Sequence, residues 1–164
     1  MRMNRFIPML LGIVLSFPIQ AADVLNAKLM TLDLARDIAN HTLEACRKQG
    51  YQTAVVVVDR AGDPQVVLRD VYVSRHAIEI ATRKAGAVIL SGISSGEFRK
   101  NRPDMRAELN EIPGVFLLQG GLPIRAGGSL IGAVGVSGAP GGEKDEACAA
   151  AAIKAVQERL DFAE

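Results

Sequence analysis

The chain has 164 residues, of which 49% are hydrophobic and 23% charged, and 19 basic residues nearly balance 18 acidic ones. This length suits one domain with a core of its own, and the hydrophobic share excludes a disordered or fibrous protein. A formal charge of +1 and the absence of tryptophan argue against a nucleic-acid-binding protein, which needs a clustered cationic surface and aromatic stacking platforms.

The first residues have the pattern of a secretory signal peptide. Two arginines precede an uncharged, mostly apolar run over residues 6–17, and small residues follow at Ala21 and beyond. The run is shorter than the roughly 18 apolar residues that a membrane-spanning helix needs. We therefore expect residues 1–21 to be cleaved. Residues 22–164 then form one periplasmic or secreted domain without a stable membrane span.

The remaining chain predicts helices and strands that form one sheet. Apolar spacing, caps and turn residues predict, in chain order, a helix from Thr31 to Gly50, strands over 53–58 and 65–68, a helix after Ser74, a short helix ending near Arg102, strands over 115–118, 122–125 and 130–137, and a helix over 143–160. Because neighbouring strands are joined as hairpins, we expect an α/β fold of the α+β type. Its central sheet is mostly antiparallel and flanked by helices.

Two histidines are the candidate ligand-binding side chains. His41 and His76 are each followed three residues later by a glutamate, so each pair shares one helix face. A zinc site would need three or four ligands, and neither histidine lies in a zinc-binding motif. The residues alone therefore indicate an exported α/β domain with a candidate ligand site at one of its histidines.

The two cysteines extend the apolar faces of the first and last predicted helices. We expect Cys46 and Cys148 to be buried thiols rather than a disulfide, because a bond requires Cα atoms roughly 4.4–6.8 Å apart. The two would come within reach only if both helices pack on the same face of the sheet. An oxidising exterior would then permit the bond.

Glycine-rich strings in the second half of the chain carry a resemblance to a known family. The segments concerned are GGLPI at 120–124, LIGAVGVSGAP at 130–140 and DEAC at 145–148, with VVVVD at 55–59 and IEIATRKA at 78–85. Together they resemble the GlcG/HbpS family over roughly residues 32–160. The resemblance implies a profilin-like fold and a homo-oligomer, commonly an octamer.

The same resemblance implies haem as ligand and cofactor. The family includes secreted haem-binding proteins and the haem-binding C-terminal domain of PduO proteins, and some members are described as haem-degrading. We therefore expect a secreted protein that binds haem or a similar small molecule, and a binding protein rather than an enzyme. The alternatives are a haem-degrading or related redox enzyme, and a ligand-free oligomeric accessory protein.

The resemblance also implies which residues would meet haem. His76 matches a position at which several relatives have a histidine, just before the helix pattern at 78–85. His41 is the candidate for the first-helix histidine of other relatives. We rank His76 first as the iron ligand, because Arg75, Arg83 and Lys84 lie nearby along the chain, where cations could meet the haem propionates.

Overall fold

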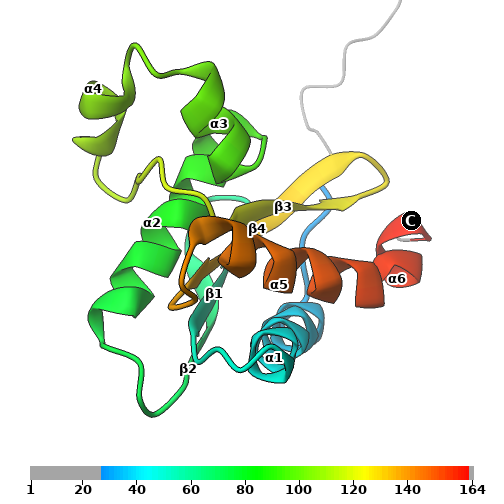
Figure 1. Cartoon of the computed structure of the whole chain (residues 1–164). Coiled ribbons are helices and arrows are strands. Elements are labelled where there is room, and N and C mark those ends of the chain that lie inside the picture. Colours follow the sequence, from blue (N-terminus) through cyan, green and yellow to red (C-terminus); the bar gives the residue numbers. More distant parts are fainter. Residues whose placement is uncertain (1–26, 163–164) are drawn as a thin grey trace, which may run out of the picture.

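A computed structural model describes residues 27–162 of the chain (Figure 1). The expected cleavage after Ala21 lies outside the described residues. The elements, in chain order, are α1 (Leu32–Lys48), β1 (Ala54–Asp59), β2 (Pro64–Arg69), α2 (His76–Ser91), α3 (Ser95–Asn101), α4 (Arg106–Asn110), β3 (Gly121–Ala126), β4 (Ser129–Ser137), α5 (Gly142–Ala155) and α6 (Gln157–Asp161). None of the helices between residues 27 and 162 is long and apolar enough to cross a membrane.

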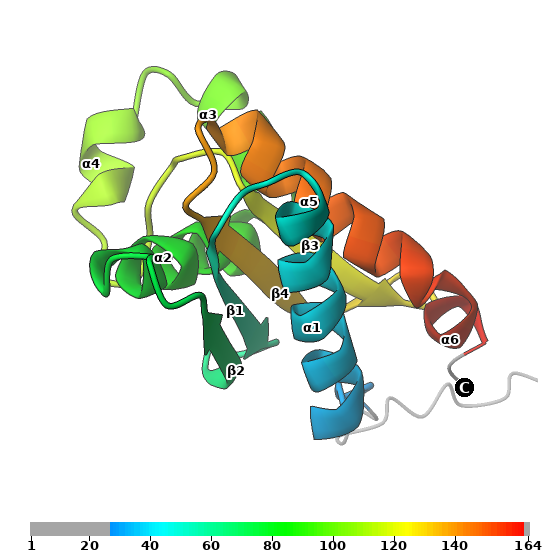
Figure 2. The same cartoon turned by 60° about the horizontal axis from the view of Figure 1, so that its bottom comes forward.

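One four-stranded sheet organises the molecule. Its strand order is β2-β1-β4-β3, and every neighbouring pair is antiparallel. Helices α1 and α5 lie side by side on one face, and α2 covers the other (Figures 1 and 2). The expected mixed α+β fold with a helix-flanked antiparallel sheet is confirmed.

Strand β1 explains why both faces need a helical cover. Val55 and Val57 belong to the core beneath α1 and α5, whereas Val56 and Val58 pack under α2. All four are fully buried. An unbroken β-branched run, without polar alternation, is the pattern of a strand covered on both sides.

The first helix begins and ends where its sequence predicts. The hydroxyl of Thr31 accepts a hydrogen bond from the backbone N–H of Leu34 at 3.3 Å, which satisfies one of the free donors of the first turn. Arg47 and Lys48 occupy the last turn, where the helix dipole favours cations. Gly50, with φ +80°, then turns the chain towards β1.

The structure differs from the predicted elements in three places between α2 and the C-terminus. Residues 115–118 form no strand, because Val115 and Leu117 pack against Ala87 of α2 instead of joining the sheet. The helix α4 was not predicted. The predicted helix over 143–160 is divided at Val156 into α5 and α6.

A glycine lets α2 lie very close to the sheet. A Cβ at Gly135, in the middle of β4, would meet the carbonyl oxygen of Ala81 at 1.9 Å. No side chain fits there without moving the helix. The backbones of α2 and β4 are therefore in direct contact at this point. Lys84, in the next turn of α2, reaches the carbonyl of Val136 near the end of β4.

Candidate functional site

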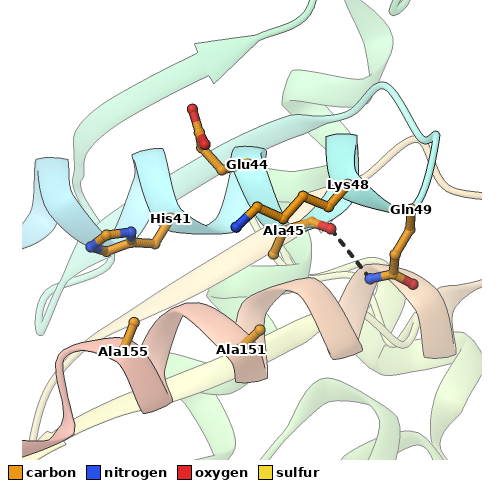
Figure 3. Close-up of a pocket in the computed structure, with 7 residues that line it drawn as sticks. All are labelled: His41, Glu44, Ala45, Lys48, Gln49, Ala151 and Ala155. Atoms are coloured by element: carbon orange, nitrogen blue, oxygen red, sulfur yellow. Dashed lines mark hydrogen bonds between the residues drawn. The ribbon is translucent and has the colours of Figure 1, made fainter.

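A groove runs along the outside of the helical layer between α1 and α5 (Figure 3). Its volume is about 370 Å³, within the range of roughly 300–1,000 Å³ typical of small-molecule sites. Its lining residues come from α1, the residue that follows it, and α5: His41, Glu44, Ala45, Lys48, Gln49, Ala151 and Ala155. The polar members are exposed, so the groove opens to solvent.

Alanines make the α5 wall of the groove flat. Ala151 and Ala155 lie four residues apart, one turn of the same helix side, and both are exposed. Ala149 and Ala152 are buried against the core on the other side of the helix. Because no α5 side chain in the groove extends beyond its Cβ, a planar apolar molecule could approach this wall closely.

The α1 wall carries the polar groups of the groove. His41 projects beside Ala155, and the Lys48 side chain extends back along α1 towards His41 (Figure 3). Glu44 points away from α5 in the same view. An imidazole and an ammonium group on α1 therefore lie opposite the apolar α5 wall, a combination that suits a flat ligand with a metal centre and carboxylates.

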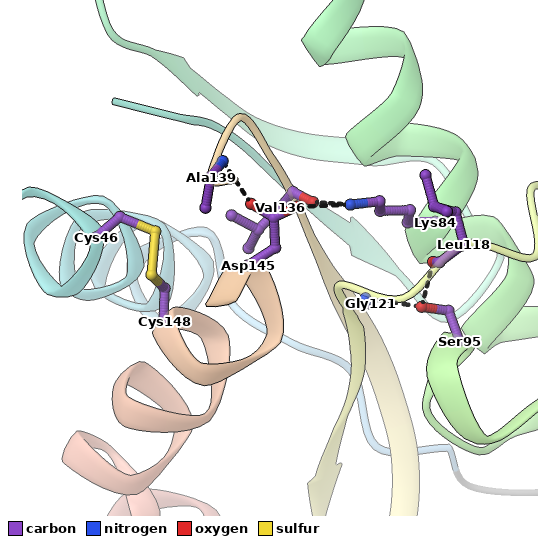
Figure 4. A network of polar contacts seen from close by, with 9 residues as sticks. All are labelled: Cys46, Lys84, Ser95, Leu118, Gly121, Val136, Ala139, Asp145 and Cys148. Carbon is purple, nitrogen blue, oxygen red and sulfur yellow. Dashed lines mark hydrogen bonds and ion pairs between the residues drawn. A yellow bond between two sulfur atoms is a disulfide. The ribbon is translucent and has the colours of Figure 1, made fainter. Parts of the chain in front are cut away.

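A disulfide beneath the groove joins its two walls. Cys46 of α1 and Cys148 of α5 are bonded, with Cα atoms 5.3 Å apart, and both are fully buried (Figure 4). The expectation of two free thiols was wrong, because the two helices do pack on the same face of the sheet. Gln49 lies over the bond, its amide nitrogen 3.8 Å from the Cys148 sulfur.

An ion pair joins α1 to the C-terminal helix near the other end of the groove. Arg159 of α6 contacts Asp37 of α1 at 2.7 Å, and Asp37 lies one turn before His41. The hydrogen bond from Arg159 holds the pKa of Asp37 below its usual value. The groove is thus held by a covalent bond at one end and an ion pair at the other.

The structure does not bring His76 to this groove. His76 begins α2, on the opposite face of the sheet, and both it and Arg75 are exposed. The backbone N–H of His76 donates to the hydroxyl of Ser74 at 3.3 Å. The two candidate histidines therefore belong to separate surfaces.

Arg83 binds the last residue of α4 and the chain that follows the helix. Its guanidinium donates to the carbonyl of Val115 at 3.0 and 3.2 Å and to that of Asn110 at 2.9 Å. It also lies over the ring of Phe116, 5.2 Å from the centroid. This side chain fixes the 110–116 segment on α2.

Lys84 is buried in an ion pair at the end of β4 (Figure 4). Its ammonium lies 2.8 Å from the Asp145 carboxylate and donates to the carbonyl of Val136 at 2.7 Å. The other oxygen of Asp145 accepts from the backbone N–H of Ala139 at 3.0 Å. Burial raises the pKa of Asp145, and the charge of Lys84 acts in the opposite direction. A haem propionate could reach Lys84 only by breaking this pair.

Sequence reasoning did not find the groove. Lys48 was not singled out, and the alanine pattern of α5 was not connected with His41. Alanines on the exposed side of a helix, at four-residue spacing, were the available signal. In the described part of the chain, no group of three or more His, Cys, Asp or Glu residues is placed to hold a metal ion.

The fold and the groove define an α+β domain with one antiparallel sheet and an open groove between two helices on one face. The family model described as "Haem degrading protein HbpS-like" matches residues 30–154, and the chain belongs to this HbpS-like family. The resemblance inferred from the glycine-rich strings is confirmed. No curated protein matches the chain.

Solved structures of similar proteins share the fold. HbpS is 32% identical, with a TM-score of 0.77 over 85% of this chain and 99% of that one. A double mutant of Streptomyces reticuli HbpS is 30% identical, with a TM-score of 0.77 over 88% and 99%. The PduOC:heme complex is 22% identical, with a TM-score of 0.70 over 78% and 95%, and supports the fold alone.

Proposed function

We propose that this chain is a haem-binding protein and that the α1–α5 groove holds the haem, with His41 as the iron ligand. The observation that carries the proposal is the position of His41 on a groove of about 370 Å³ with a flat alanine wall, in a chain of the HbpS-like family. A neutral imidazole is an established axial ligand of haem iron.

The groove residues suit the parts of the haem molecule. Ala151 and Ala155 offer an apolar surface to the macrocycle, and the ammonium of Lys48 would pair with a propionate. Haem would supply redox chemistry and strong visible absorption. Because the groove is open, part of a bound ligand would stay exposed to solvent.

A haem titration followed by absorption spectroscopy tests the proposal. The parent should show a Soret band that saturates with added haem. His41→Ala should weaken binding at least about tenfold, because even loss of a group that only orients a metal ligand costs that much, and it should shift the band. His76→Ala is the matched control and should bind like the parent. Loss of binding in His76→Ala alone would restore the ranking made from sequence, and no change in either variant would refute histidine ligation.

The same titration separates the alternative functions. A haem-degrading or related redox enzyme should lose its haem absorption when an electron donor is added. A ligand-free accessory protein should show no Soret band at all. We favour a binding protein, because the one imidazole of the groove, His41, is assigned to the iron.

We further propose that the protein is exported, periplasmic or secreted, after cleavage at Ala21. The disulfide supports this, because such bonds persist mainly in oxidising compartments. N-terminal sequencing of the exported protein should begin at or near Ala22; a chain that still carries Met1 would contradict export by cleavage. The homo-octamer implied by the resemblance is likewise a proposal, for which light scattering gives the mass.

A further inference from the structure

The disulfide lies directly beneath the floor of the α1–α5 groove. Cys46 follows Ala45, a lining residue of α1, and Cys148 lies one turn before Ala151, a lining residue of α5. Both cysteines are fully buried, whereas the polar residues of the groove above them are exposed. The side chains that line the groove therefore separate the bond from solvent.

Gln49 is the groove residue whose side chain contacts the bond. It reaches from the end of α1 towards α5 (Figure 3), where its amide nitrogen donates to the Cys148 sulfur at 3.8 Å and to the carbonyl oxygen of Ala45 at 3.3 Å. Sulfur is a weak acceptor, and the second bond is longer than the usual range. Gln49 is exposed, and exposed side chains change rotamer within nanoseconds. A rotamer change of Gln49 thus removes its contact with the sulfur without moving either helix.

The same bond fixes the spacing of the two groove walls. Helices α1 and α5 contribute one wall each, and the disulfide is a covalent link between them (Figure 4). At the other end, the ion pair between Asp37 and Arg159 fixes α1 to α6. Reduction leaves that end attached and frees the end at Gln49. A rigid ligand that contacts both walls binds less tightly when the walls are no longer held in position.

We propose that the disulfide is a thiol-exchange site reached through the groove, and that its reduction weakens ligand binding there. The reductant is a dithiol. Its thiolate bonds to the Cys148 sulfur while the sulfur–sulfur bond breaks, and Cys46 leaves as a thiolate that takes up a proton. The second thiol of the reductant then displaces Cys148. Two electrons pass to the protein, which ends with two thiols, and the reductant ends as a disulfide.

Ligand binding and reduction act on each other. This half of the proposal rests on the proposed haem-binding function of the groove. A ligand beside Gln49 holds that side chain over the sulfur and slows the exchange. If reduction lowers the affinity for the ligand by some factor, the bound ligand opposes reduction by the same factor. A tenfold effect corresponds to about 30 mV in the reduction potential of this two-electron couple.

Reduction of the ligand-free protein by dithiothreitol tests the route through the groove. Gln49→Ala removes the cover and should be reduced at least about tenfold faster than the parent, because an open conformation populated at about 10% or less limits the parent. Gln49→Met keeps a side chain of the same length and should stay near the parent rate. Gln157→Ala is the matched control, since it removes the same side chain at an exposed position of α6. Mass spectrometry of alkylated samples gives the rates.

The competing route is reduction after global unfolding, which follows the stability of each variant. The parent and the three variants should therefore unfold at the same urea concentration. The groove route is overturned if Gln49→Ala is reduced at the parent rate, if either other variant is accelerated equally, or if the acceleration accompanies a lower unfolding midpoint. A mixed disulfide trapped with 2-mercaptoethanol should map to Cys148; a mixed disulfide at Cys46 would overturn the assigned attack.

Binding of zinc protoporphyrin IX tests the coupling. Zinc accepts an imidazole and has no redox chemistry, so the probe does not react with thiols. The reduced protein should bind it about tenfold more weakly, a typical coupling between two sites. Saturating probe should slow reduction of the parent, a measurement that does not require the isolated reduced form. Equal affinities or an unchanged rate overturn the coupling. If the probe binds neither form, the proposed haem-binding function fails, and the rates of the ligand-free variants still decide the exchange site.

Discussion

Lys84 and Asp145 connect the two helical layers past the end of β4. Both side chains are almost fully buried, Lys84 1% and Asp145 3% exposed, and each has a further hydrogen bond to the backbone. A buried ion pair contributes little net stability compared with apolar residues of similar size, because both charges lose their hydration. Removal of one partner leaves an unpaired buried charge, which is costly.

Replacement of Lys84 with Met should therefore destabilise the protein strongly. We expect the free energy of unfolding to fall by about 3 kcal/mol, the lower end for breaking a buried pair. Urea denaturation at fixed protein concentration measures this. Lys154→Met, at an exposed position of α5, is the control and should change stability by less than about 0.5 kcal/mol. Equal stability of the two variants would show that the Lys84 pair is not required.

Lys84 illustrates how far the role of a single residue can be predicted from the sequence alone. Along the chain, Lys84 and Arg83 look like free cations near His76. Their surroundings depend on distant partners, since Lys84 binds Asp145 61 residues away and Arg83 binds Val115 32 residues away. His41 was equally visible in the sequence, but the groove beside it exists only once α5 packs against α1.

Helices α1 and α5 are the elements that define the candidate site. The disulfide joins the two helices at one end of the groove, and the ion pair between Asp37 of α1 and Arg159 of α6 joins the layer at the other end. The bond closes a loop whose ends are 102 residues apart. A cross-link of this length restricts the unfolded chain considerably.

Removal of both cysteines by Cys46→Ala and Cys148→Ala should lower the free energy of unfolding by about 2–5 kcal/mol. Denaturant titration measures the loss. Intact-mass spectrometry of the denatured parent, with and without a reductant, is the companion measurement and should show a gain of two hydrogens on reduction. Free thiols in the unreduced parent would contradict the bond.

Elements formed by local interactions agree with the sequence patterns more closely than those that depend on distant packing. The helix capped by Thr31, the buried strand β1 and the final hairpin of β3 and β4 are determined by caps, β-branched runs and turn glycines. The 115–118 segment has the apolar character of a strand, yet its backbone is bound by Arg83 and Asn110. Short apolar runs do not specify whether a sheet or a helix will cover them.

At the scale of the whole molecule, the candidate surfaces are separate. The groove lies on the outside of the α1–α5 layer, and His76 lies at the start of α2 on the opposite face of the sheet. A variant on one surface should therefore leave the other intact, because distant sites with no shared partners act nearly independently. The effects of His41→Ala and His76→Ala on haem binding can thus be compared directly.

The disulfide also determines how the molecule responds to mechanical force. All four strands lie within residues 54–137, inside the covalent ring closed by Cys46 and Cys148. Tension applied at residues 27 and 162 enters through α1, crosses the sulfur–sulfur bond and leaves through α5 and α6. The sheet carries none of this load. Pulled from its ends, the protein extends only by the chain outside the ring until the bond is reduced, and the sheet is mechanically shielded.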